Sequence, residues 1–255
     1  MRLNLDELCG CFPTGRYYPG IAERMRMLPQ ETIEGLAEEF DAHAAWVDLP
    51  FAVIDFETTG LHAEKDRVLE MGIVLFSQGE LEAHHNFLIH PGMPVPEEAR
   101  AVHGIGDDEL KDAPRFEALV PTLWELLRGR IAVAYNAQFD RGFLYAELKR
   151  AGLGSERDLP PAFRPDVHWI DPLVWVRELQ KFERSKKLSD VCARLGIPLD
   201  RAHRAASDAE ATGKVLLALA PQMPKSYAEV MRLQLRYSQQ QEAELARWRA
   251  RRNKS

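Results

Sequence analysis

The spacing of apolar residues changes along the chain, and the changes predict where strands and helices lie. A short apolar run at 51–57, FAVIDFE, ends at the turn-like sequence TTG and predicts a buried strand. Two further runs, 68–76 and 81–89, flank SQGE and predict a hairpin. Short runs at 131–134 and 167–170 predict two more buried strands.

Helical spacing follows these strands in the second half of the chain. The predicted helices cover 116–127, 139–151, a segment that runs from the last strand to residue 179, 188–195 and 207–219. Strands that come first and then alternate with helices indicate an α/β fold with a mixed sheet. We place this main domain at residues 48–220.

Both ends of the chain are expected to be helical extensions of that domain. In the first 47 residues, five apolar side chains recur along one helical face: Ile33, Leu36, Phe40, Ala44 and Val47. This pattern predicts an amphipathic helix that packs on the main domain or, alternatively, on a partner. The segment 221–255 contains strong helix formers and a basic end, which fits a solvated helix and a segment that grips nucleic acid or a partner equally well.

Composition narrows the class of protein. The 255 residues are 45% hydrophobic and 28% charged, which is typical of an ordinary soluble domain. No apolar run reaches the length of a membrane span, and the N-terminus lacks the apolar stretch of a secretory signal, so we expect no membrane association. The three cysteines, Cys9, Cys11 and Cys192, show no zinc-like pairing, and we expect a reducing cytoplasmic location.

The net charge of −6 is unevenly spread. Residues 225–255 hold 8 Lys and Arg against 3 Glu, so that segment carries +5 and the remainder carries −11. An acidic body suits an enzyme whose carboxylates are neutralised by bound cations, since the metals then face the phosphates of a substrate.

Two acids stand at the end of the first predicted strand. Because side chains alternate along a strand, Asp55 and Glu57 point to the same face. Two anions this close repel each other unless a cation joins them, and hard oxygen ligands suit Mg²⁺ or Mn²⁺. The alternative is a strand end exposed to water, where such a pair has no special role.

Three further polar residues stand near helix starts. Asn136 is a natural N-cap, and Asp140 then falls in the first turn of a helix, where the helix dipole alone can explain an acid. His203 precedes another helix start, at which Asp208 is open to the same alternative. Four acids from three distant segments, each at a strand end or helix start, are difficult to explain separately.

These three segments resemble the Exo I, Exo II and Exo III motifs of the DEDDh, or DnaQ-like, 3′–5′ exonucleases, which include polymerase proofreading subunits. Exo I is DFETTG from Asp55, Exo II runs from Asn136 to Asp140, and in Exo III His203 stands five residues before Asp208. The resemblance covers about residues 49–220 in the right order. One departure is Tyr135, where many relatives have histidine.

The resemblance implies an RNase H-like fold with a mixed five-stranded sheet, and a site that holds two divalent ions, Mg²⁺ or Mn²⁺. It implies Asp55, Glu57 and Asp208 as principal metal ligands, Asp140 as a ligand of the second ion, and His203 as general base. Six residues are predicted to contact substrate: Thr58, Thr59, Gly60, Leu61, His103 and Asn136.

The expected function is removal of nucleotides from the 3′ end of single-stranded DNA in proofreading or repair. An RNA-trimming or oligoribonucleotide-degrading enzyme of the same family is the alternative, because the motifs carry phosphodiester chemistry and do not recognise the 2′-hydroxyl. A catalytically silent subunit that binds a polymerase is disfavoured, since none of the four acids or His203 is missing. The terminal helices are candidates for docking a DNA polymerase.

Overall fold

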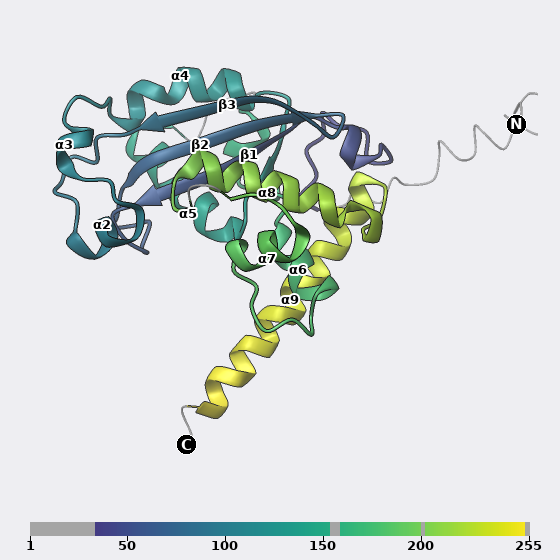
Figure 1. Cartoon of the computed structure of the whole chain (residues 1–255). Helices are drawn as coiled ribbons and strands as arrows, with labels where there is room; N and C mark the ends of the chain where they lie inside the picture. Colours follow the sequence, from purple (N-terminus) through teal and green to yellow (C-terminus); the bar gives the residue numbers. More distant parts are fainter. Residues whose placement is uncertain (1–33, 154–158, 200–201, 253–255) are drawn as a thin grey trace, which may run out of the picture. The chain divides into compact units, whose positions relative to one another are not determined.

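A mixed sheet forms the centre of the protein (Figure 1). The structure is a computed structural model that describes residues 34–153, 159–199 and 202–252, all within one compact unit, Glu34–Ser255. The strands are β1 (Phe51–Thr58), β2 (Val68–Ser77), β3 (Glu80–Leu88) and β4 (Ile131–Val133), in the order β3-β2-β1-β4. Strand β1 is antiparallel to β2 and parallel to β4, and β2 is antiparallel to β3.

The sheet has four strands, so the prediction of a fifth strand at 167–170 is wrong. Only an isolated parallel bridge joins Ile170 to Val133. The neighbouring backbone groups bond elsewhere: His168 N–H donates to the Gly35 carbonyl (2.8 Å), and the Trp169 carbonyl accepts from Gln234 Nε2 (2.8 Å). A backbone whose donors and acceptors are used by a loop and a helix cannot extend the ladder.

Helices cover both faces of the sheet because successive strand residues point to opposite sides. On one face, β1 and β2 contribute Phe51, Val53, Val74 and Phe76 to a core shared with four helices: α6 (Pro172–Leu179), α7 (Leu188–Leu195), α8 (Ala205–Leu219) and α9 (Tyr227–Arg252). On the other face, Ala52, Ile54, Met71 and Ile73 pack with α4 (Phe116–Leu127) and α5 (Ala137–Arg150).

Short helices complete the described fold. Helices α2 (Glu97–His103) and α3 (Asp107–Leu110) follow the hairpin, and Leu69, Ile105 and Leu110 form a small core there. Single 3-10 turns lie at Trp46–Asp48, Pro161–Phe163 and Ala220–Gln222. Among the described helices, none has both the length and the apolarity that a membrane crossing requires.

The amphipathic helix expected before residue 47 is not formed over residues 34–47, so that prediction is wrong there. Leu36, Phe40 and Val47 nevertheless pack against the core as expected. Turns and the short 3-10 helix replace the α-helix. The reason is backbone pairing: Trp46 N–H donates to the Lys225 carbonyl (3.0 Å), and Ala45 forms an antiparallel bridge with Ser226. Ile33, Cys9 and Cys11 lie outside the described residues.

The helix α9 has two differing halves. Tyr227, Val230, Met231 and Gln234 are buried against the domain, whereas the C-terminal half extends away from it (Figure 1). The division of the chain at residues 47 and 220 stays a prediction.

Candidate active site

The end of β1 supplies the first two acids. Asp55 and Glu57 share the face of β1 that carries Phe51 and Val53, which is the face covered by α8. Across the ladder, Asp55 pairs with Gly72 and Glu57 pairs with Glu70. The strand pattern therefore places both carboxylates toward the start of α8, as the alternation of the sequence predicts.

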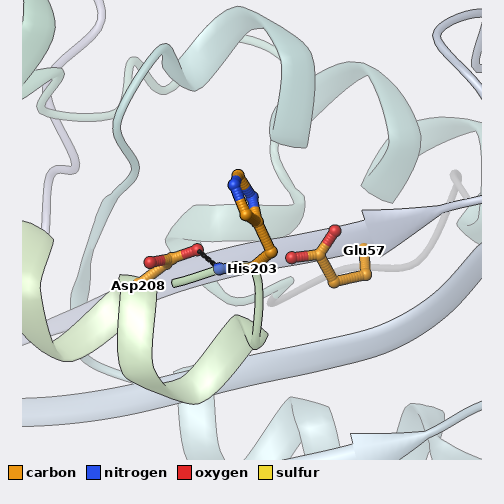
Figure 2. Close-up of side chains that lie close together, drawn as sticks. All are labelled: Glu57, His203 and Asp208. Carbon is orange, nitrogen blue, oxygen red and sulfur yellow. Dashed lines mark hydrogen bonds between the residues drawn. The ribbon is translucent and has the colours of Figure 1, made fainter. Parts of the chain in front are cut away.

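The start of α8 supplies His203 and Asp208. His203 precedes the helix in a left-handed conformation (φ 65°), and its backbone N–H donates to Asp208 Oδ2 (2.9 Å). The ligand atoms of Glu57, His203 and Asp208 lie within 4.8 Å of one another. Figure 2 shows these three side chains, from β1, from the loop before α8 and from α8, gathered at one place. Residues far apart in the sequence thus form one site.

Asp140 reaches the same strand end from the other side of the sheet. It lies in the first turn of α5, is 3% exposed, and its Oδ1 accepts a hydrogen bond from the Phe56 N–H (3.1 Å). Because Phe56 lies between Asp55 and Glu57, this bond places the Asp140 carboxylate beside both acids.

The helix that carries Asp140 is capped from outside. Asn136 occupies the N-cap position with φ 70°, but its side chain makes no capping bond. The carboxylate of Asp171 replaces it by accepting from the Asn136 N–H and the Ala137 N–H, both at 3.0 Å. Asp171 also caps its own helix through the Leu173 N–H (2.9 Å). The predicted N-cap position, Asn136, is confirmed, but the capping group is the Asp171 carboxylate and not the Asn136 side chain.

Burial and mutual repulsion raise the pKa values of these four acids. Burial, followed by the charges of Asp140, Asp208 and Glu57, raises the pKa of Asp55 well above its ordinary value. Burial and the charges of Asp208 and Glu70 raise the pKa of Glu57 to about 8, although Arg204 opposes the shift. Burial is also the main cause of the raised pKa values of Asp140 and Asp208.

The set of donors fits a divalent metal. Four carboxylates crowded in a partly buried place repel one another, and a hard cation relieves that repulsion by taking their oxygens as ligands. Glu57, Asp208 and His203 are already close enough to share one ion. The residues that could hold metal are therefore Glu57, Asp208 and His203, together with Asp55 and Asp140, whose charges act on the same cluster.

A buried ion pair that the sequence analysis missed supports this site. Glu70 is fully buried and accepts hydrogen bonds from Arg204 Nη2 (2.6 Å), Asn86 Nδ2 (2.8 Å) and the Ala205 N–H (3.0 Å). Burial raises the pKa of Glu70, but these hydrogen bonds offset it and leave the pKa below its ordinary value. The pair holds Arg204, the neighbour of His203, against the sheet. An acid inside the apolar run VLEMGIVLF was the available signal.

The residues predicted to contact substrate differ in how exposed they are. Thr58 and Thr59 are buried, and their hydroxyls bond locally, to the Gly60 carbonyl (2.6 Å) and to Asp66 (3.4 Å). Leu61 is 77% exposed beside them. Their contact with a nucleotide stays a prediction.

His103 lies in the last turn of α2, where burial lowers the pKa of its imidazole. Its Nδ1 accepts from the Ile105 N–H (3.1 Å), while its buried Nε2 has no hydrogen-bond partner among the described residues. The contact of His103 with a substrate stays a prediction.

A cleft of about 670 Å³ opens beside Asp208 and His203. His203, Asp208 and Asn136 line it together with the basic side chains Arg177 and Lys187. The cleft therefore brings an acidic site and positive side chains into one cavity, which suits an anionic substrate held near bound cations.

Comparison with known proteins gives the family. Residues 52–216 match the family model RNase_T, described as exonuclease. The DNA polymerase III PolC-type of Thermotoga maritima is 31% identical over 194 residues, which cover 76% of this chain and 13% of that protein. The PolC-type polymerase of Bacillus cereus is 34% identical over 177 residues, covering 69% and 12%. The chain thus spans only about an eighth of the length of these relatives.

Solved structures agree on the fold. The zinc-bound complex of E. coli ExoI with single-stranded DNA has a TM-score of 0.61 and 20% identity, over 69% of this chain and 41% of that one. The nuclease domain of 3′hExo, a DEDDh family member bound to rAMP, has a TM-score of 0.56 and 17% identity, over 68% and 92%. The expected RNase H-like exonuclease fold is therefore confirmed, apart from the strand count.

Proposed function

The chain belongs to the RNase_T exonuclease family and is of the DEDDh type, and we propose that it hydrolyses single-stranded DNA from the 3′ end. The products would be nucleoside monophosphates. The observation that carries this proposal is the cluster of Glu57, Asp208 and His203, with Asp55 and Asp140 beside it, next to a cleft that Asp208 and His203 line.

Each residue of the site has a proposed role. Asp55, Glu57 and Asp208 would be the principal ligands of two divalent ions, Mg²⁺ or Mn²⁺, and Asp140 would complete the shell of the second. Such ions supply an activated water and stabilise the charge on the leaving 3′ oxygen. His203, on the exposed side of the cluster, would accept the proton of the attacking water, because a neutral imidazole nitrogen is a proton acceptor.

Local geometry supports the role of His203. Its left-handed backbone directs the N–H to Asp208, so the residue is anchored through its main chain while its imidazole stays exposed. A general base must be fixed in place and still reach solvent, and this arrangement satisfies both needs. Thr58, at the end of β1, and Thr59, Gly60 and Leu61, on the turn that follows, are proposed to hold the terminal nucleotide.

DNA is the preferred substrate in this proposal because the relatives that show the family are DNA polymerases by name. The RNA-trimming alternative stays open, since one structure of the same fold is described as a 3′-exonuclease that recognises a histone mRNA stem-loop. Proofreading, and docking of a polymerase through the terminal segments, remain predictions, because the chain matches only a small part of those polymerases.

The test is hydrolysis of 5′-labelled single-stranded DNA and matched RNA by the full chain, with Mg²⁺, with Mn²⁺ and with chelator. We expect a metal-dependent ladder that shortens from the 3′ end, faster on DNA. Asp208→Asn should remove it, whereas Glu125→Gln, an exposed acid on α4, should not. Faster cleavage of RNA would favour the alternative, and an intact oligonucleotide with folded protein would overturn the proposal.

A further inference from the structure

The loop between α6 and α7 combines positive charge with an uncovered aromatic ring. Residues 180–187 have the sequence QKFERSKK, with four basic residues and one acid in a chain whose net charge is −6. Phe182 is 93% exposed, more than any other large hydrophobic residue described. Only the Lys181 ammonium stands over its ring, 5.6 Å from the centroid. The exposed ring therefore leaves a flat apolar face open to a ligand, next to positive charge.

Hydrogen bonds fix the shape of this loop. Arg194 Nη2 donates to the Ser185 carbonyl (2.9 Å) and to Gln180 Oε1 (2.8 Å), while the Ser185 hydroxyl donates to Asp190 Oδ2 (2.5 Å). Lys186 Nζ donates to the Glu183 carbonyl. Hydrogen bonds thus join both Gln180 and Ser185 to α7, and they hold the backbone on either side of Phe182 in place.

Tyr135 ties the same loop to the site. Its hydroxyl donates to the Lys186 carbonyl (2.5 Å), and burial raises the pKa of that phenol, which keeps it protonated as a donor. Tyr135 immediately precedes Asn136, at the start of the helix that carries Asp140. The position where the sequence departs from many relatives is therefore the link between the loop and the acids.

The loop forms one wall of the cleft. Lys186, Lys187 and Arg177 line the cavity that also contains His203 and Asp208. A strand whose 3′ end lies at Asp208 and His203 would pass its preceding phosphates along these cations. Phe182 is not among the residues that line the cleft; it stands four residues before Lys186 in the same loop, so the next bases must leave the cleft along the loop to reach its ring. Aromatic stacking suits any sequence because every base has a flat face, whereas in a duplex those faces are hidden.

We infer that the 180–187 loop is a binding site for single-stranded nucleic acid upstream of the scissile bond, with Phe182 stacked on a base and the loop cations on the backbone. This inference rests on the proposed function for its polarity, because the 3′ end must lie at the acids. The ligand is a single strand of either sugar; a separate arm of the test distinguishes DNA from RNA.

The test is binding by the full chain of a 5′-fluorescein dT 12-mer, and of the matching rU 12-mer, each with phosphorothioate linkages at the 3′ end, in Mg²⁺. Fluorescence anisotropy gives the Kd. Phe182→Ala should weaken binding about 5- to 100-fold, the loss expected for one stacked base, and Phe182→Trp should retain it. Lys186→Gln with Lys187→Gln should lower the slope of log Kd against log salt by roughly 0.7 for each lost phosphate contact.

Two matched variants serve as controls. Leu81→Ala removes an exposed apolar side chain from β3, and Trp248→Ala removes the exposed aromatic of the basic helix α9. A Kd for Phe182→Ala within twofold of the wild-type Kd on both 12-mers would overturn the inference. So would weaker binding by Trp248→Ala together with unchanged binding by Phe182→Ala. If Phe182 governs binding but unmodified strands stay intact, the proposed function fails and the binding site stands.

Discussion

The backbone of Ala205 occupies the space into which a side chain on Gly72 would project. A Cβ at position 72 would lie 2.3 Å from the Ala205 carbonyl carbon and 2.3 Å from the Ala206 nitrogen, closer than real atoms approach. Since Gly72 pairs with Asp55 in the sheet, this bare position lets the start of α8 come against the strand that carries the first acid. The distance between the acids of β1 and α8 therefore depends on a glycine.

Gly72→Ala should separate the two halves of the site. The added methyl group meets backbone rather than a movable side chain, so α8 must shift, and with it Asp208. We expect a cost of about 1–3 kcal/mol in the free energy of unfolding and at least a roughly tenfold fall in kcat, because small displacements of a reacting group are costly. Urea unfolding and single-strand hydrolysis measure the two effects.

A second glycine provides the control. At Gly142, inside α5, an added Cβ would meet only the Ala63 Cβ, at 3.9 Å. Gly142→Ala should leave kcat unchanged and stabilise the helix by about 0.5–1 kcal/mol. Equal kcat for the two variants would show that the approach of α8 to Gly72 does not set the geometry of the site.

Arg204→Gln should reduce both stability and activity. It leaves the fully buried Glu70 without its main partner, which costs about 3 kcal/mol, near the lower end for a broken buried pair because Arg204 is itself partly exposed. It also frees the segment that carries His203, so kcat should fall. Chemical denaturation and steady-state kinetics measure both.

An exposed pair serves as the reference for that variant. Arg128 lies 3.2 Å from Glu125, and both side chains are more than half exposed. Arg128→Gln should change the free energy of unfolding by less than about 0.5 kcal/mol. If Arg204→Gln is equally mild, Glu70 does not depend on the pair.

The metal-free protein should lose stability as the pH rises from about 7 to about 8.5. Glu57 has a pKa of about 8 when folded and an ordinary value near 4 when unfolded, so in this window the folded state binds more protons and each rise in pH favours unfolding. The lowered pKa values of His103 and His168 act in the opposite sense near pH 7, because their unfolded imidazoles bind more protons there than the folded ones. We expect the Tm in chelator to fall by about 2–5 °C.

Divalent ions should reverse this trend. They bind the deprotonated carboxylates, so the rise in Tm caused by Mg²⁺ should be larger at about pH 8.5 than at about pH 7. Glu57→Gln should flatten the dependence seen in chelator; what remains would include the Cys192 thiol, whose pKa is raised by burial. A metal-free Tm that climbs with pH would contradict the assignment of these shifts.

The sequence predicts the parts of the site that depend on local pattern. Strand alternation places Asp55 and Glu57 on one face, and helix starts place Asp140 and Asp208 in first turns, all of which the structure bears out. Proximity of the segments came from family resemblance and not from the residues alone. Local rules fix the direction of a side chain but not the packing of distant elements.

The failures have one cause in common. The expected strand near Ile170 and the expected helix before Val47 are prevented by backbone bonds to distant segments, at Gly35, Gln234 and Lys225. Such partners lie up to 179 residues away in the chain, from Trp46 to Lys225, and no periodicity within a window reveals them. The partner of Glu70, Arg204, likewise lies 134 residues further on, although an acid inside an apolar run already distinguishes Glu70 itself.

Gln234 links the C-terminal helix to the candidate site, which gives the last prediction. Its Oε1 accepts from the Asp171 N–H (2.8 Å) and its Nε2 donates to the Trp169 carbonyl (2.8 Å), while the Asp171 carboxylate caps the helix that carries Asp140. Gln234→Leu leaves these buried backbone groups unpaired, at a cost of about 2–3 kcal/mol. Because the cap loosens with them, Mg²⁺ affinity and kcat should fall together.

The exposed Gln240, six residues further along the same helix, is the matched control. Gln240→Leu makes the same chemical change where no buried group depends on it, so unfolding midpoint, Mg²⁺ affinity and kcat should stay at their wild-type values. Stability lost in Gln234→Leu with both active-site parameters unchanged would show that α9 braces the fold without reaching the acids. A fall in all three would make the first half of α9 part of the exonuclease domain and move the predicted boundary at residue 220 beyond Gln234.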